Sequence, residues 1–193
     1  MSDDSSTQNP KLTLSDILFI FSLIGILAFL GWSGSLAYSE GMKTETTKRN
    51  AEALAKWFTE AGVERFKPDY ALNECAPTIK SNNIDNTNPE PTVTPRTWGE
   101  CLKAISTPPE FLTTLTNPFF DSPIAFISKC NKGDYTLAGA MILEKLTPTP
   151  AGSALPFMTT QLVESDRIDQ KMQIRITVCD NGAYPILVTE VAF

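Results

Sequence analysis

The chain has 193 residues, 42% of them hydrophobic, and a net charge of −6 at pH 7. This acidic balance argues against nucleic-acid binding as the main function, because binding to a phosphate backbone draws on a basic surface. The sequence contains no histidine, so any active site would lack the commonest general base and the commonest metal ligand.

The first predicted element is an apolar helix near the N-terminus. Ile17 to Ser39 form a run of 23 residues without a charged side chain, and Asp16 directly precedes it. As a helix rising about 1.5 Å per residue, this run can cross a bilayer core of about 30 Å. It is longer than the apolar core of a secretory signal peptide. We therefore predict a retained membrane anchor over residues 12–39, preceded by a polar leader over residues 1–11.

Two features give opposite orientations for this anchor. Lys11 is the only basic residue before the apolar run, whereas Lys43, Lys48 and Arg49 follow it. By the positive-inside rule, this distribution places the larger part of the chain in the cytoplasm. The four cysteines all follow the anchor, and they favour an oxidising compartment instead. Charge alone leaves the orientation open.

The helix is expected to continue beyond the membrane as an amphipathic half over residues 40–66. Apolar residues recur there at i, i+3, i+4, i+7 and i+10, which places them on one face of a helix; they are Ala51, Leu54, Ala55, Phe58 and Ala61. Pro68 prevents easy continuation. We predict one helix from Leu14 to about Arg65.

Residues 67–122 are expected to form a variable region of loops and short helices. The segment 82–95 is rich in Asn, Thr and Pro and predicts an exposed loop. Thr97 and Glu100 have the spacing of a capping box, which predicts a short helix through Ile105. A second short helix is expected over residues 110–115.

Residues 123–193 show the pattern of strands separated by turn residues. Expected strands are Ile124–Ser128, Thr136–Leu146, Phe157–Val163, Met172–Cys179 and Ile186–Phe193. Asp180-Asn-Gly182 predicts a tight turn between the last two. Strands in this succession form an antiparallel sheet, and the Ala51/Leu54/Phe58 face is available to cover its apolar side. The predicted fold class is α+β, a long N-terminal helix packed on a C-terminal antiparallel sheet.

The four cysteines are Cys75, Cys101, Cys130 and Cys179. None forms a C-x-x-C pair, which argues against zinc-ribbon and thioredoxin-like sites. Their even number and wide spacing favour two disulfides over four buried free thiols. Three pairings are open. One of them joins Cys75 to Cys101 across the polar loop and Cys130 to Cys179, and each closure would contribute roughly 3–4 kcal/mol in the chain-entropy model.

The segment Leu12-Thr-Leu-Ser-Asp-Ile-Leu-Phe-Ile-Phe-Ser-Leu-Ile-Gly-Ile-Leu-Ala28 resembles the N-terminus of type IV pilins and type II secretion pseudopilins. The matching positions are Thr13, Leu14 and the run from Gly25 to Ala28, and Asp16 stands where the family has glutamate. The remainder matches the family only in plan: a long helix, a variable loop, a C-terminal antiparallel sheet and disulfides. The pair Cys130–Cys179 is similar to the disulfide that closes the C-terminal region of many pilins.

The resemblance implies a structural subunit of a pilus or secretion pseudopilus. It implies cleavage after Lys11 by a prepilin peptidase, with Leu12 as the new N-terminus. It also implies a bacterial inner-membrane protein that crosses the membrane once, with its globular domain in the periplasm, or outside the cell when it is part of a pilus. Its partners would be other pilin or pseudopilin subunits. Two features depart from the family: Lys11 replaces the glycine before the cleavage site, and the leader carries Asp3 and Asp4 where family leaders are basic.

Asp16 has two interpretations. The resemblance implies that its carboxylate pairs with the free amine of a neighbouring subunit during assembly. Its position after Thr13 also fits a local capping box. Gly25 would allow close helix packing in lipid.

The other aspartates lie in or near turns, and no spacing predicts a metal site, a cofactor site or a catalytic motif. We expect a pilin-like structural subunit and not an enzyme. The alternative from another class is a non-polymerising, signal-anchored periplasmic binding or scaffold module.

Overall fold

The computed structural model describes residues 13–67, 69–77, 95–149 and 155–193. The chain divides into two compact units, Met1–Gly41 and Met42–Phe193. The long helix α1, Leu14–Glu64, belongs to both units. Its bounds agree with the helix predicted from Leu14 to about Arg65.

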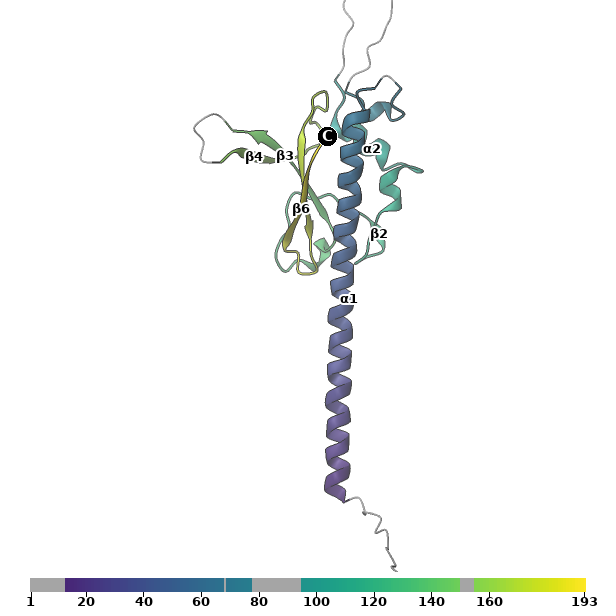
Figure 1. The fold of residues 1–193 in the computed structure, drawn as a ribbon, viewed down its shortest axis with the longest axis vertical. Helices are drawn as coiled ribbons and strands as arrows, with labels where there is room; N and C mark the ends of the chain where they lie inside the picture. The colour runs from purple at the N-terminus through teal and green to yellow at the C-terminus, as the bar shows by residue number, and fades with distance from the viewer. Residues whose placement is uncertain (1–12, 68, 78–94, 150–154) are drawn as a thin grey trace, which may run out of the picture. The chain divides into compact units, whose positions relative to one another are not determined.

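The second unit contains a four-stranded sheet beside α1 (Figure 1). Its strands are β3 (Met141–Pro148), β4 (Phe157–Gln161), β5 (Gln173–Cys179) and β6 (Pro185–Ala192). They lie in the order β4-β3-β5-β6, and every neighbouring pair is antiparallel. The α+β architecture predicted from the sequence is confirmed.

Shorter elements precede the sheet along the chain. They are the 3-10 helices η1 (Asn73–Cys75), η2 (Phe111–Thr114) and η3 (Tyr135–Leu137), the helix α2 (Trp98–Ile105), and the two-stranded hairpin of β1 (Thr116–Asn117) and β2 (Ser122–Pro123). The capping box of α2 is confirmed: Glu100 N donates to Thr97 Oγ1 at 3.4 Å, and Thr97 N donates to the Glu100 carboxylate at 3.1 Å.

Two predicted strands differ from the structure. Ile124–Ser128 is not a strand, since only Phe126 makes an isolated bridge, to Met141. Thr136 does not begin a strand, because the Asp134 side chain accepts a hydrogen bond from Thr136 N and starts η3 instead. The predicted helix over 110–115 is the single 3-10 turn η2. The exposed loop predicted over 82–95 lies almost wholly outside the described residues.

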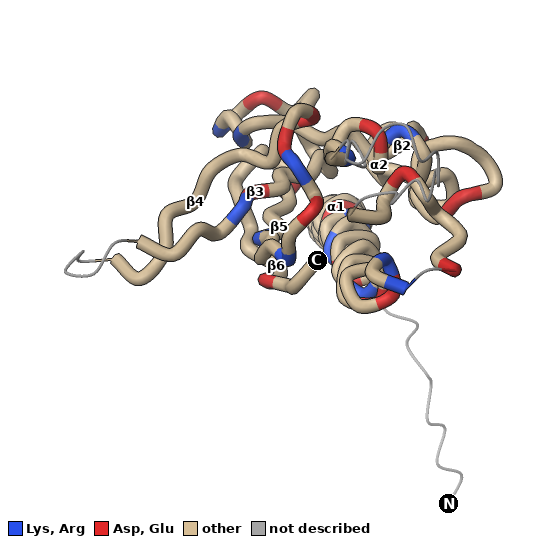
Figure 2. Tube along the Cα trace, turned by 90° about the horizontal axis from the view of Figure 1, so that it is seen from above, with Lys and Arg blue, Asp and Glu red and all other residues tan. Residues whose placement is uncertain are grey.

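The core of the second unit lies between the α1 face predicted from the sequence and the sheet. Leu54, Phe58, Ile174 and Ile176 are fully buried in one cluster. Aromatic rings join the elements there: Phe58 lies 5.1 Å from Phe193 and 5.6 Å from Trp98 between ring centroids. This contact fixes α1, α2 and the end of the chain to one another. The edge strand β4 carries no charged residue (Figure 2). All of its residues are exposed.

Candidate assembly segment

The start of α1 is closed by a local hydrogen-bond network. The Asp16 carboxylate accepts from Thr13 N at 2.9 Å and from Thr13 Oγ1 at 2.6 Å. Asp16 N donates in turn to Thr13 Oγ1 at 3.3 Å. This reciprocal arrangement is the capping box expected from the sequence, and it satisfies amides that the first turn of a helix leaves unpaired.

The uncharged half of α1 is long and apolar enough to span a membrane, and it is the only described helix with that property. Its side chains are exposed throughout, as Phe19, Phe21 and Trp32 illustrate. Two of its four serine hydroxyls bond back to the helix: Ser33 Oγ donates to Leu30 O, and Ser39 Oγ donates to Leu36 O. Such internal bonds suit a helix in lipid, where unpaired polar groups are costly.

Small residues are distributed around this half of α1. A side-chain carbon added at Gly25, Gly31 or Gly34 would meet no atom within 4 Å. At about 100° per residue, Asp16 and Gly34 lie on one face of the helix and Gly25 on the opposite face. A single neighbouring helix therefore cannot contact both Asp16 and Gly25 on the same side. This distribution suits a bundle in which each helix has several neighbours.

Two predicted site residues, Lys11 and Leu12, lie outside the described residues. The structure therefore neither brings the N-terminus to Asp16 nor separates them. Asp16 keeps capacity for a further donor, because a carboxylate offers about four acceptor positions and Thr13 occupies two. The capping role and a pairing with an amine are compatible.

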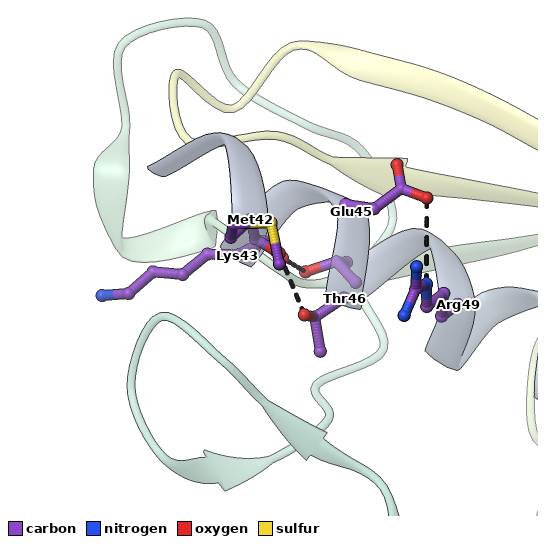
Figure 3. A network of polar contacts seen from close by, with 6 residues as sticks. Met42, Lys43, Glu45, Thr46 and Arg49 are labelled. Carbon is purple, nitrogen blue, oxygen red and sulfur yellow. Dashed lines mark hydrogen bonds and ion pairs between the residues drawn. The ribbon is translucent and has the colours of Figure 1, made fainter. Parts of the chain in front are cut away.

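Charged side chains reappear where α1 enters the second unit (Figure 3). Lys43 extends outward from the helix, and Arg49 lies 3.9 Å from the Glu45 carboxylate. The hydroxyls of Thr46 and Thr47 donate to the carbonyls of Met42 and Lys43. The polar surface of the amphipathic half thus begins directly after the uncharged run.

Both cysteine pairs of the second unit are disulfides. Cys75 bonds to Cys101 across 26 residues, and Cys130 bonds to Cys179 across 49 residues. The sequence allowed three pairings of the four cysteines. The structure has the one in which Cys75 and Cys101 flank the polar loop. The second disulfide ties the chain before η3 to the last residue of β5.

The sequence reading missed one buried cation, Arg65, just past the end of α1. It is 1% exposed, and its guanidinium donates to Ile168 O at 2.6 Å and to Gln170 O at 2.8 Å. It also lies over the Phe193 ring, 4.1 Å from the centroid. Burial lowers the pKa of Arg65 to about 10, so the group remains charged at neutral pH. Its position four residues after Ala61, on the apolar face of α1, is the signal that sequence reasoning overlooked.

The aspartates that the sequence places in turns serve their own loops. Asp134 caps η3, Asp180 accepts from Gly182 N and Tyr184 N, and Asp166 accepts from Val163 N and pairs with Lys145. No group of three or more metal-ligating side chains occurs among residues 13–193 outside the undescribed gaps. Backbone capping therefore explains Asp134, Asp166 and Asp180.

No protein-family model, curated protein or solved structure matches this chain.

Proposed function

We propose that the chain is a pilin-like or pseudopilin-like structural subunit that assembles through the uncharged half of α1 into a pilus or secretion pseudopilus. The observation that carries this proposal is the combination of Asp16 with an uncharged, fully exposed helical segment that directly follows it. A surface of this kind is stable only in lipid or against other apolar helices.

The architecture supports the proposal independently of the N-terminal sequence. The apolar face of the second half of α1 packs on an antiparallel sheet, and disulfides close the regions before and within that sheet. One helix therefore belongs both to a membrane-compatible segment and to the core of a globular unit. This arrangement lets a subunit leave the membrane without refolding its globular part.

The proposed mechanism has no turnover. In the membrane, the globular unit lies in the periplasm and the uncharged run holds the subunit. During assembly, Asp16 receives the α-amine of a neighbouring processed N-terminus, because a carboxylate in lipid is costly until it gains a partner. Gly25 and Gly34, on opposite faces, admit neighbouring helices closely.

Lys11 supports a second candidate function. A glycine precedes the cleavage site in the pilin pattern, and Lys11 occupies that position here. An uncleaved chain would carry no new amine for Asp16 to meet. It would then act as a single-pass anchored periplasmic binding or scaffold module.

Mass spectrometry of the mature N-terminus distinguishes the two candidates. A chain that begins at Leu12 supports assembly, particularly if its amine is methylated. An intact leader in cells with active prepilin peptidase supports the anchored module instead.

Substitution of Asp16 tests the assembly mechanism itself. We expect Asp16→Ala to insert in the membrane at the wild-type level but to be lost from the sheared filament fraction, measured by immunoblot. Thr13→Ala is the matched control, because it removes the hydroxyl of the capping box and leaves the carboxylate. Wild-type filament levels in Asp16→Ala, or equal losses in both variants, would restrict Asp16 to capping.

A further inference from the structure

The strand β4 lies at an edge of the main sheet, next to β3. Its outer side pairs with no other strand of the described residues. Together with the end of β3, it extends away from the part of α1 in the second unit (Figure 1). One side of β4 is therefore open to another extended chain.

The backbone groups on this open side can be identified from the bonds on the other side. Leu162 N donates to Leu143 O, and Thr149 N donates to Pro156 O, so residues 156 and 162 bond to β3. Successive residues of an antiparallel strand alternate between bonding one neighbour and facing the other. The following residues therefore direct their N–H and C=O groups to the open side: Phe157, Thr159 and Gln161.

The other edge strand, β6, carries features that hinder pairing with a further strand. Its first residue, Pro185, has no N–H to donate, Glu190 adds a charge, and a register shift interrupts its pairing with β5. At its end, α1 comes so close that a side-chain carbon on Gly62 would lie 3.0 Å from Ala192 O. Proline, charge, bulges and a covering helix are the means by which proteins protect sheet edges. β4 itself has no proline, charge or register shift, so its edge is left available.

Exposed apolar side chains are concentrated on β4 and beside it. Four of them are 43–66% exposed: Leu155, Phe157, Met158 and Val163. Phe157 and Met158 point to opposite faces of the strand, because successive side chains alternate. Neither face of β4 is therefore covered there by the rest of the described unit. Exposed apolar side chains next to open backbone groups favour contact with another strand.

We infer that β4 pairs with β4 of a second copy of this chain, in antiparallel orientation about a two-fold axis at Thr159. In this register, Thr159 lies opposite its own counterpart, and Phe157 lies opposite Gln161 of the second copy. These are the residues whose N–H and C=O groups face the open side, so each of those groups gains a hydrogen-bond partner. The interface is self-complementary, as a two-fold contact requires.

The same register brings the exposed apolar side chains together. Leu155 of one copy lies opposite Val163 of the other, and Phe157 lies diagonally from that Val163, within reach of an aromatic side chain. Because of the two-fold axis, this apolar cluster occurs at both ends of the paired strands. On the other face, Met158 lies opposite Thr160. A second copy therefore supplies apolar side chains where those of β4 are exposed.

No like charges lie opposite each other in this contact. The paired strands themselves are uncharged. The adjoining residues of β3, Glu144 and Lys145, have opposite signs, and Lys145 pairs with Asp166. Glu164 follows the strand, and the two-fold axis places its two copies at opposite ends of the contact. The acidity of the whole chain therefore opposes pairing only at long range, where salt screens it.

The two-fold axis closes this pair, which therefore differs from the open, head-to-tail contacts of a filament. The inference goes beyond the proposed function and requires neither cleavage after Lys11 nor the carboxylate of Asp16. The pairing also covers a sheet edge that could otherwise template aggregation.

Sedimentation equilibrium of the full chain in detergent measures the pairing. We expect a reversible dimer for the wild type. Thr159→Pro should raise the dissociation constant about a hundredfold, because it removes an outward N–H and the change acts twice in a two-fold pair. Thr159→Ala is the matched control, since it keeps the backbone group, and it should change the constant by less than about fivefold.

Hydrogen exchange resolved by residue tests the register. On dilution of the wild type from dimer to monomer, the amides of Thr159 and Gln161 should lose protection. The amides of Met158 and Thr160 face β3 and should keep theirs. Retained protection of Thr160 in the Thr159→Pro variant shows that β4 remains on β3, so that its loss of pairing is not a loss of folding.

Thr159→Lys gives an independent test, because it places two like charges opposite each other at the axis and should also weaken pairing. Asp16→Ala should dimerise as the wild type does, so failure of the filament proposal would leave this inference intact. A chain that stays monomeric up to its solubility limit would overturn the inference and leave the edge to a different protein. A dimer that persists in both Thr159→Pro and Thr159→Lys, or that is lost in Asp16→Ala, would overturn it by placing the contact in α1.

Discussion

At the scale of single residues, Arg65 is the most consequential polar side chain of the globular unit. It directly follows the last residue of α1 and binds two carbonyls of the connection between β4 and β5. Its two terminal guanidinium nitrogens are thus hydrogen-bonded, whereas the buried Nε has no hydrogen-bond partner among the described residues. The two bonds offset part of the cost of burying a cation. The stacking of the guanidinium on Phe193 adds packing that a lysine side chain does not reproduce.

We predict that Arg65→Met lowers the free energy of unfolding of the globular unit by about 2–4 kcal/mol, because two buried carbonyls lose their donors. Arg65→Lys should fall between this variant and the wild type, since one ammonium cannot reproduce both bonds. Urea denaturation of the full chain in detergent measures these values. Arg49→Met is the control, because its exposed ion pair should contribute less than about 1 kcal/mol. An Arg65→Met variant as stable as Arg49→Met would contradict the prediction.

Gly139 is a second residue whose identity is set by its surroundings. Its φ is +75°, and an added side-chain carbon would collide with the Asn117 side chain. Gly133 has a similar φ of +83° but open space around it. We predict that Gly133→Ala costs about 1 kcal/mol from backbone strain alone. Gly139→Ala should cost about 2–4 kcal/mol, because it also displaces the buried Asn117 bond to Ala138. Equal losses of urea stability would show that the collision relaxes freely.

At the scale of elements, the buried face of α1 could be predicted from the sequence, whereas the start of β3 could not. The i, i+3, i+4 repeat from Ala51 to Ala61 predicted the buried face, because helical periodicity over many residues is a strong signal. The start of β3 was misplaced because five residues before it form η3 and a turn through Gly139. A side-chain cap and a left-handed glycine override strand propensity there.

Substitution of two glycines in α1 tests how closely the helix must approach the end of β6. A side-chain carbon at Gly62 would lie 2.8 Å from Phe193 Cα and 3.0 Å from Ala192 O, whereas one at Gly41 would meet no atom within 4 Å. We predict that Gly41→Ala raises helix stability by about 0.5–1 kcal/mol, the ordinary preference for alanine in a helix. Gly62→Ala should instead lower the thermal midpoint, because α1 must move away from the end of β6. A stabilised Gly62→Ala variant would mean that the close approach is not needed for packing.

Only some features of the candidate assembly segment could be predicted from the sequence. Thr13 and Asp16 have the spacing of a capping box, and the structure forms it. The opposite placement of Asp16 and Gly25 follows from helix geometry once the helix is known to be continuous. The position of Arg65 on the apolar face of α1 was a signal of its burial, but a charged residue at a helix end is usually exposed. Its two carbonyl partners come from a connection about a hundred residues later in the chain.

At the scale of the whole molecule, the disulfides limit how the globular unit can unfold. They enclose loops of 26 and 49 residues, and all the strands of the main sheet except β6 lie within or directly beside the second loop. Closing such loops restricts the unfolded chain by an entropy that grows slowly with loop length. Each disulfide therefore stabilises residues that it does not contact.

The disulfides also provide the last prediction, which concerns both stability and compartment. Removing Cys75–Cys101 as a double alanine variant should lower the free energy of unfolding by about 3.5 kcal/mol, and removing Cys130–Cys179 by about 4 kcal/mol, from loop length alone. Urea denaturation without reductant measures both losses, and reduced wild type should lose at least as much as either variant.

Peptide mapping of the same protein, isolated without reductant, should recover these two linkages and no free thiol, because the proposed periplasmic position would expose the cysteines to an oxidising compartment. Four free thiols would contradict a periplasmic position for the globular unit while leaving its fold intact. The pairs Cys75–Cys130 and Cys101–Cys179 would contradict the fold itself, since they would require α2 and β5 to exchange partners.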